Sequence, residues 1–208
     1  TTTFWAGCPG SSDPRESADF VINNCVTCRT WTGNNNSTDW YDPLNWTPSV
    51  VPTDTDCVII ANATFNPLLT YPGAPVPPTP GEALNITVQN NGHLVIDDDK
   101  LLTVDDWITI ENGGRLTINA DANLELMNQL TVQGTGYLEI LNSGSLVQVN
   151  DAAVNTGETR MQRTVTGLNG SDYVYWSSPV ANFDVGNISP GTAANLIWEW
   201  IPSVGDDY

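Results

Sequence analysis

The stretch ITIENGGRLTI, residues 108–118, contains two short runs of alternating apolar residues with a Gly pair between them. Taken alone, it has the pattern of a β-hairpin. Similar stretches occur on either side, ITVQNNGHLVI at 86–96 and LTVQGTGYLEI at 130–140. The offset is 22 residues in both cases, and it places Gly92, Gly114 and Gly136 at equivalent positions.

A fixed period near 20 residues with strand-type content indicates a β-solenoid. We therefore predict an all-β fold, a short right-handed parallel β-helix of three to four coils with about 22 residues and three strands per coil. Each strand would pair in parallel with its equivalent one coil away, with alternate side chains pointing inward. We expect the recurring Gly114 to occupy a corner with positive φ, a conformation that costs glycine little.

The repeat divides the chain into three parts. We predict the β-helix over 57–156, with the Pro-rich run at 71–83 pushed out of the coil as a loop. Because an exposed coil end is an unpaired sheet edge, both ends need covering. Residues 1–56 are therefore expected to form a Cys/Trp-rich N-terminal cap, and residues 157–208 a C-terminal β cap or the start of a following β module.

The four cysteines, Cys8, Cys25, Cys28 and Cys57, all lie in the first 57 residues. An even number at one end indicates a disulfide-stapled cap in an oxidising compartment, with three possible connectivities. The CxxC spacing of Cys25 and Cys28 keeps a redox pair or a zinc site as alternatives. We favour disulfides, because the surrounding residues look like loop and strand and the spacing matches no standard zinc knuckle.

The charge balance is strongly acidic, with 24 acidic and 6 basic residues and a net charge of −18. Such a surface repels phosphate, so nucleic acid and anionic membranes are poor partners, whereas Ca²⁺ and neutral sugars are compatible with it. No stretch approaches the roughly 20 apolar residues of a membrane span. The chain starts TTTFWAGCPG without a basic-then-apolar leader, and we interpret it as the mature or trimmed form of a secreted protein.

Two groups of residues are candidate binding sites. Trp40, Tyr41 and Trp46 either cover the first coil or form a platform on which sugar rings stack. Asp97, Asp98 and Asp99 form an acidic turn that is either simply solvated or a Ca²⁺ site, since carboxylates and water supply the oxygen ligands that Ca²⁺ takes. No other cofactor is expected.

Catalytic residues are harder to find. His93 is the single histidine, and its repeat equivalents are Arg115 and Tyr137, which indicates an exposed position tolerant of size. A polysaccharide lyase would need clustered carboxylates beside an Arg or Lys, for which the candidates are Asp97, Asp98, Asp99, Asp105 and Asp106, with Lys100 and Arg115 nearby in sequence. Three or four coils are short for the long groove of such enzymes, so we predict that the protein is not an enzyme.

The order of motifs resembles a recurring region of large, adhesin-like secreted surface proteins of gliding, type IX-secreting Gram-negative bacteria. The resemblance is carried by TWTGNNNSTDWYDPLNWTPSVVPTDTDCVII at 30–60, the GHLVI and GRLTI coils, and YVYWSSPV at 173–180. It covers roughly 30–180, and it implies a β-helical fold and a cell-surface location rather than a reaction.

We therefore expect an extracellular structural or adhesive module of a cell surface. One form of this function is self-assembly into a filament through β-edge pairing, in which an N-terminal strand such as TTTFWAG would take part. The alternative is a carbohydrate-binding module, and a less favoured one is a polysaccharide lyase or hydrolase. Expected partners are cell-surface or matrix components, including glycans, and copies of the chain itself.

Overall fold

The computed structural model describes residues 27–70 and 80–169, together with residues 172, 174, 184–187 and 191–197. The chain divides into two compact units, Thr1–Thr164 and Val165–Tyr208. All described strands belong to the first unit. The described residues of the second unit include two 3₁₀ turns, η2 Val185–Asn187 and η3 Ala194–Leu196.

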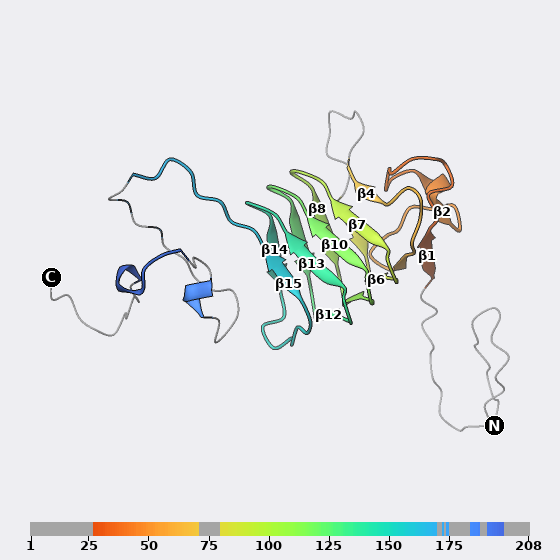
Figure 1. Ribbon diagram of the computed structural model, residues 1–208. Helices are drawn as coiled ribbons and strands as arrows, with labels where there is room; N and C mark the ends of the chain where they lie inside the picture. Colours follow the sequence, from red (N-terminus) through yellow and green to blue (C-terminus); the bar gives the residue numbers. More distant parts are fainter. Residues whose placement is uncertain are drawn as a thin grey trace, which may run out of the picture. The chain divides into compact units, whose positions relative to one another are not determined.

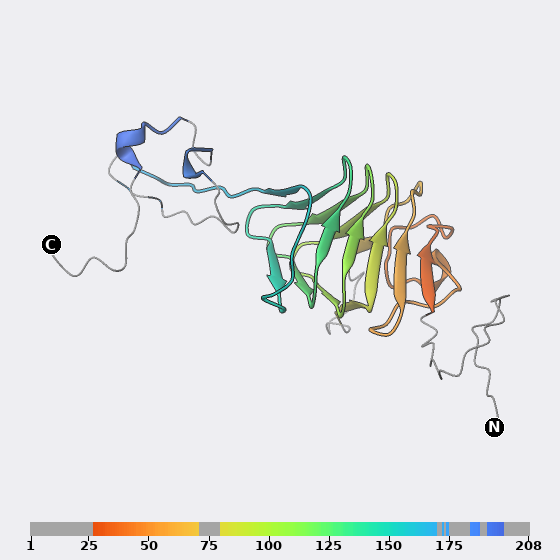
Figure 2. The same cartoon turned by 90° about the horizontal axis from the view of Figure 1, so that it is seen from below.

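The first unit is an all-β solenoid of about four turns with a spacing of about 22 residues, as predicted (Figures 1 and 2). Its strands form three sheets, and every pairing is parallel except that of β1 with β2. The first sheet holds, in spatial order, β2 Trp46–Thr47, β1 Cys28–Trp31, β3 Cys57–Ile60, β6 Asn85–Val88, β9 Ile108–Ile110 and β12 Leu130–Val132. The second holds β4 Leu68–Leu69, β7 His93–Ile96, β10 Arg115–Ile118, β13 Tyr137–Ile140 and β15 Thr159–Met161. The third holds β5 Gly81–Ala83, β8 Leu101–Val104, β11 Asn123–Leu126 and β14 Ser145–Gln148.

The two strands of residues 108–118 belong to different sheets, so the hairpin interpretation is excluded. Strand β9 pairs with β6 and β12, and β10 pairs with β7 and β13. The register is constant, with Leu116 opposite both Leu94 and Leu138. Because the side-chain period of a strand is two, this register keeps every inward residue above an inward residue of the next coil.

The core is a stack of aliphatic side chains inside the three sheets. In the coil that begins at Ile108, the six inward residues have no exposed surface: Ile108, Ile110, Leu116, Ile118, Leu124 and Leu126. Burial of one such side chain contributes about 1.5–3 kcal/mol. This term holds the coils together, while Thr109 and Glu125 lie half-buried on the outer faces.

The conformation expected for the recurring glycine is wrong. Positive φ occurs instead one residue earlier in two coils, at Asn91 (59°) and Gly113 (73°), and two residues earlier in the next coil, at Gly134 (58°). The recurring glycines are small for a different reason, the close approach of the preceding coil. A Cβ atom on Gly92 would lie 2.4 Å from the carbonyl oxygen of Ile60, and one on Gly136 would lie 2.5 Å from that of Glu111.

The solenoid extends further than the predicted 57–156 at both ends. Strand β1 pairs in parallel with β3, so residues expected in a separate cap already belong to the first sheet. Strand β15 pairs with β13 and carries the second sheet past residue 156. The loop predicted over 71–83 ends too late, because Gly81–Ala83 forms β5 and pairs with β8.

Several predicted segments lie outside the described residues. These are the TTTFWAG run at 1–7 and most of YVYWSSPV at 173–180. The C-terminal β module therefore stays a prediction.

The corner glycines make a testable distinction between close approach and backbone conformation. Gly136→Ala should lower the free energy of unfolding by about 1–3 kcal/mol, because the new methyl group meets backbone that cannot move independently of the coil. Urea unfolding followed by circular dichroism measures this change. Gly113→Asn is the matched control, because Asn91 adopts positive φ at the equivalent corner; a larger loss in this variant than in Gly136→Ala would contradict the assignment.

Candidate functional site

The N-terminal tryptophans form a packed cluster rather than a platform. Trp31, Trp40 and Trp46 are 1%, 0% and 1% exposed. Trp46 lies edge-on to both neighbours, with ring centroids 5.0 Å from Trp31 and 4.8 Å from Trp40, and its Nε1 donates to the Trp40 carbonyl at 2.8 Å. A sugar-stacking role for Trp40 and Trp46 is therefore wrong, since neither ring has a free face. Tyr41 is half-buried and packs against the same core.

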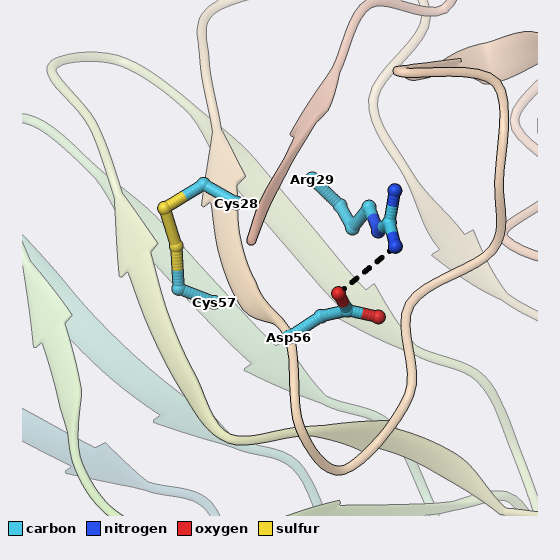
Figure 3. The surroundings of a disulfide bond; sticks show 4 residues. All are labelled: Cys28, Arg29, Asp56 and Cys57. Atoms are coloured by element: carbon cyan, nitrogen blue, oxygen red, sulfur yellow. Dashed lines mark ion pairs between the residues drawn. A yellow bond between two sulfur atoms is a disulfide. The ribbon is translucent and has the colours of Figure 1, made fainter. Parts of the chain in front are cut away.

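A disulfide joins Cys28 to Cys57 next to this cluster (Figure 3). The register of β1 on β3 places the two residues directly opposite each other, with their Cα atoms 4.4 Å apart. The redox and zinc alternatives are therefore wrong for Cys28, whose sulfur is already bonded. Cys8 and Cys25 lie outside the described residues.

An ion pair lies beside the disulfide and ties the same two strands together. The guanidinium of Arg29 lies 3.0 Å from the carboxylate of Asp56, which is 4% exposed (Figure 3). Asp56 also accepts hydrogen bonds from the backbone N–H and the hydroxyl of Thr53. This carboxylate is fully engaged in holding the turn before β3, as a buried charge requires.

The acidic residues 97–99 form the turn between the second and third sheets. Asp99 has φ of 61°, and its equivalents Asp121 and Ser143 also have positive φ, so this is the corner position with left-handed backbone. Asp97 accepts a hydrogen bond from the Asn119 amide one coil further on, at 3.3 Å. Among the described residues, no group of three His, Cys, Asp or Glu side chains is placed to hold a metal ion. The Ca²⁺ site at Asp97, Asp98 and Asp99 stays a prediction.

The corner between the third and first sheets carries a row of stacked polar side chains. The Asn128 amide donates to Asp106 and the Asn150 amide donates to Asn128, both at 2.9 Å. The row lines a shallow depression of about 440 Å³. Asp106, a candidate for lyase chemistry from the sequence, is thus a hydrogen-bond acceptor within this row.

The outer face of the second sheet carries a different row, which we call the His–Arg–Tyr row: His93 on β7, Arg115 on β10 and Tyr137 on β13. The parallel register places the three residues directly opposite one another. Arg115 Nη2 lies 3.0 Å from His93 Nδ1, and Arg115 Nη1 donates to the Tyr137 hydroxyl at 3.1 Å. At the far end, the guanidinium of Arg160 lies 3.7 Å from the centre of the Tyr137 ring and pairs with Glu158.

The protonation of His93 follows from these contacts. A guanidinium only donates hydrogen bonds, so His93 Nδ1 accepts and the proton is on Nε2, 3.0 Å from Thr117 Oγ1. Burial of the ring, and then the charge of Arg115, lower the pKa of His93 from 6.5 to about 4. At neutral pH the imidazole is uncharged, and Arg115 supplies the positive charge of the row.

Sequence reasoning missed this row because it treated the three residues as variants of one tolerant position. The exposed position expected for His93 is in fact half-buried, as are those of Arg115 and Tyr137. The signal was present in the 22-residue offset. Residues that share a repeat position are also neighbours in space, so three hydrogen-bonding side chains at one position predict a bonded row.

The lowered pKa of His93 makes stability depend on pH. Since the folded-state pKa is about 4 and the unfolded value 6.5, the unfolded chain takes up the proton first. The contribution of His93 to stability is complete above pH 6.5 and is lost as the pH falls to 4. Solvent screening limits this loss to on the order of 1 kcal/mol. His93→Gln should remove this loss, so that the variant loses less stability than the wild type between pH 7 and pH 4.5. Urea unfolding of both proteins at the two pH values measures the difference. An equal loss in both proteins would contradict the neutral-histidine assignment.

The disulfide should contribute more. Cys28 and Cys57 are 29 residues apart, and cross-linking a loop of this size stabilises a fold by about 2–4 kcal/mol. The double variant Cys28→Ser/Cys57→Ser should lose this amount in urea unfolding under non-reducing conditions. Replacing both residues together avoids a free thiol, and an unchanged unfolding midpoint would show that the staple is redundant with the tryptophan cluster.

None of the helices in the described part of the chain has both the length and the apolar character that crossing a membrane requires. Comparison with curated proteins gives no match, and neither does comparison with solved structures. One family model matches the chain twice, over residues 30–131 and again over 108–208, so that the two matches together span most of it. The chain belongs to that family, which is described as a domain of unknown function (DUF8693).

Proposed function

We propose that this chain is a non-catalytic structural and adhesive module on the outside of a cell. The observation that carries the proposal is the Cys28–Cys57 disulfide, which closes the first coil of the solenoid. Disulfides of this kind persist in oxidising compartments and are rare where thiols are kept reduced. The net charge of −18 supports the same location, since it keeps a surface module soluble and away from anionic membranes.

The construction of the solenoid supports a structural role. A single continuous aliphatic core runs through all coils, and a tryptophan cluster packs at its N-terminal end. The outer faces of the three sheets present side chains at a fixed spacing of about 4.8 Å between coils. Such a rigid, regular face is suited to holding binding groups in position. The resemblance to surface proteins of gliding, type IX-secreting bacteria supports the same proposal.

Filament assembly through pairing at the N-terminal edge of the solenoid has less support. Strands β2 and β4 have two residues each, so they offer few backbone groups to a pairing partner. Short edge strands are a common way in which β-proteins prevent edge-to-edge association. We therefore propose adhesion through a face of the solenoid in preference to assembly through its N-terminal edge.

The location can be tested on intact cells of the source organism. Antibodies raised against the folded chain should label the cell exterior without permeabilisation, as seen by immunogold electron microscopy, and brief protease treatment of whole cells should remove the label. A cytoplasmic protein probed in parallel controls for lysis. Label that appears only after permeabilisation would overturn the proposal.

A further inference from the structure

We propose that the His–Arg–Tyr row binds the carboxylate groups of an acidic polysaccharide, a chain that contains uronic acid. The site lies on the outer face of the second sheet, across β7, β10 and β13. The inference deepens the proposed function and rests on it, because it names the ligand class of the adhesive module.

The row has hydrogen-bond donors that its internal contacts leave over. Arg115 carries five N–H groups, of which two are used, one toward His93 and one toward Tyr137. One N–H remains on each terminal nitrogen, and guanidinium N–H groups of this kind can bind a carboxylate through two hydrogen bonds. The Tyr137 hydroxyl accepts from Arg115, so its own hydrogen is left to donate to a ligand oxygen.

Arg115 has no counter-charge among the described residues. Arg29 pairs with Asp56 and Arg160 pairs with Glu158, whereas no described carboxylate lies within 4.0 Å of Arg115. Its neighbours in the row are a neutral imidazole and a phenol. A half-buried guanidinium without a carboxylate stands out in a chain with 24 acidic and 6 basic residues, and an external carboxylate would supply the missing charge.

The backbone around the row favours a polysaccharide over an extended peptide. Strands β7, β10 and β13 are internal strands of the second sheet, with a neighbour on both sides, so none of them is a free strand edge. Extended peptides are bound mainly through free backbone groups at strand edges. A ligand on this face has to be recognised by side chains alone, and a uronic acid chain offers carboxylate and hydroxyl oxygens for that purpose.

Binding of the purified 208-residue chain to polygalacturonate tests the proposal, with isothermal titration calorimetry as the measurement. The buffer should contain EDTA, to exclude bridging by Ca²⁺, and about 150 mM salt, where charges more than about 8 Å apart are largely screened. The net charge of −18 repels a polyanion at long range, so this screening is needed for the local contact at Arg115 to decide binding. Methyl-esterified polygalacturonate has the same backbone without the free carboxylates and is the ligand control. Poly-glutamate tests whether an acidic peptide is bound instead.

Three variants identify the groups involved, with thermal unfolding used to confirm that each one folds. Arg115→Gln should weaken binding at least tenfold, and Arg115→Lys should weaken it less, because charge remains but the guanidinium N–H groups are lost. Tyr137→Phe should weaken binding a few-fold. Lys100→Gln is the matched control, since it removes one positive charge at a corner and should change affinity less than twofold.

Binding of polygalacturonate but not of its ester, lost in Arg115→Gln and kept in Lys100→Gln, supports the proposal. No binding, equal binding of the ester or of poly-glutamate, or equal losses in the two charge variants would overturn it. The binding measurements use the purified chain and are independent of the location test. A failure to bind would therefore not affect the immunogold result, and an intracellular location would not affect a measured affinity.

Discussion

Parallel backbone pairing at a constant 22-residue register is the constraint on which the rest of this structure depends. Once Leu94, Leu116 and Leu138 lie opposite one another, every other repeat position must stack as well. Inside the coil, the stacking joins apolar side chains into one core. At a corner, it joins Asp106, Asn128 and Asn150 into a row of amide hydrogen bonds. On the outer face of the second sheet, the same register assembles the His–Arg–Tyr row.

The start of the solenoid needs interactions of another kind, because the first coil has no preceding coil to stack upon. Here the chain uses large aromatic side chains and a covalent bond in place of repetition. Trp31, Trp40 and Trp46 belong to the same buried core as the aliphatic stack. The disulfide and the Arg29–Asp56 ion pair then fix β1 to β3 at both faces of the strand pair. The cap is thus continuous with the core rather than a separate domain.

The sequence was sufficient to predict the solenoid, because a repeat that places Ile, Leu and Gly at a fixed offset is compatible with few folds. The details it could not provide depend on three-dimensional packing. Superposing the repeats shows that Gly114 recurs but does not distinguish positive φ from close approach of a neighbouring carbonyl. Composition likewise shows that Trp40 and Trp46 are aromatic without showing which way they point.

The candidate site was missed for a related reason. His93, Arg115 and Tyr137 occupy the same position of the repeat. Because they differ so much in chemistry, their comparison indicated an exposed position that tolerates any side chain. In a solenoid, equivalents are contacts, and chemical difference at one position is what allows a donor, an acceptor and a charge to meet. The disulfide connectivity could not be assigned from the sequence, because four cysteines allow three sets of pairings. The pairing of Cys28 follows from the register of β1 on β3.

The direction of the Cys28–Cys57 bond has a mechanical consequence. Hydrogen bonds between coils run roughly along the axis of the solenoid, so a force that pulls on the two ends loads them one coil at a time, as in opening a zipper. Under a pull on the chain before Cys28, the load first reaches β1, which lies between β2 and β3 in the first sheet. The disulfide joins it to β3 along the same axis, so the load on that first pair of strands passes through a covalent bond, and unravelling from this end is blocked where it would otherwise begin.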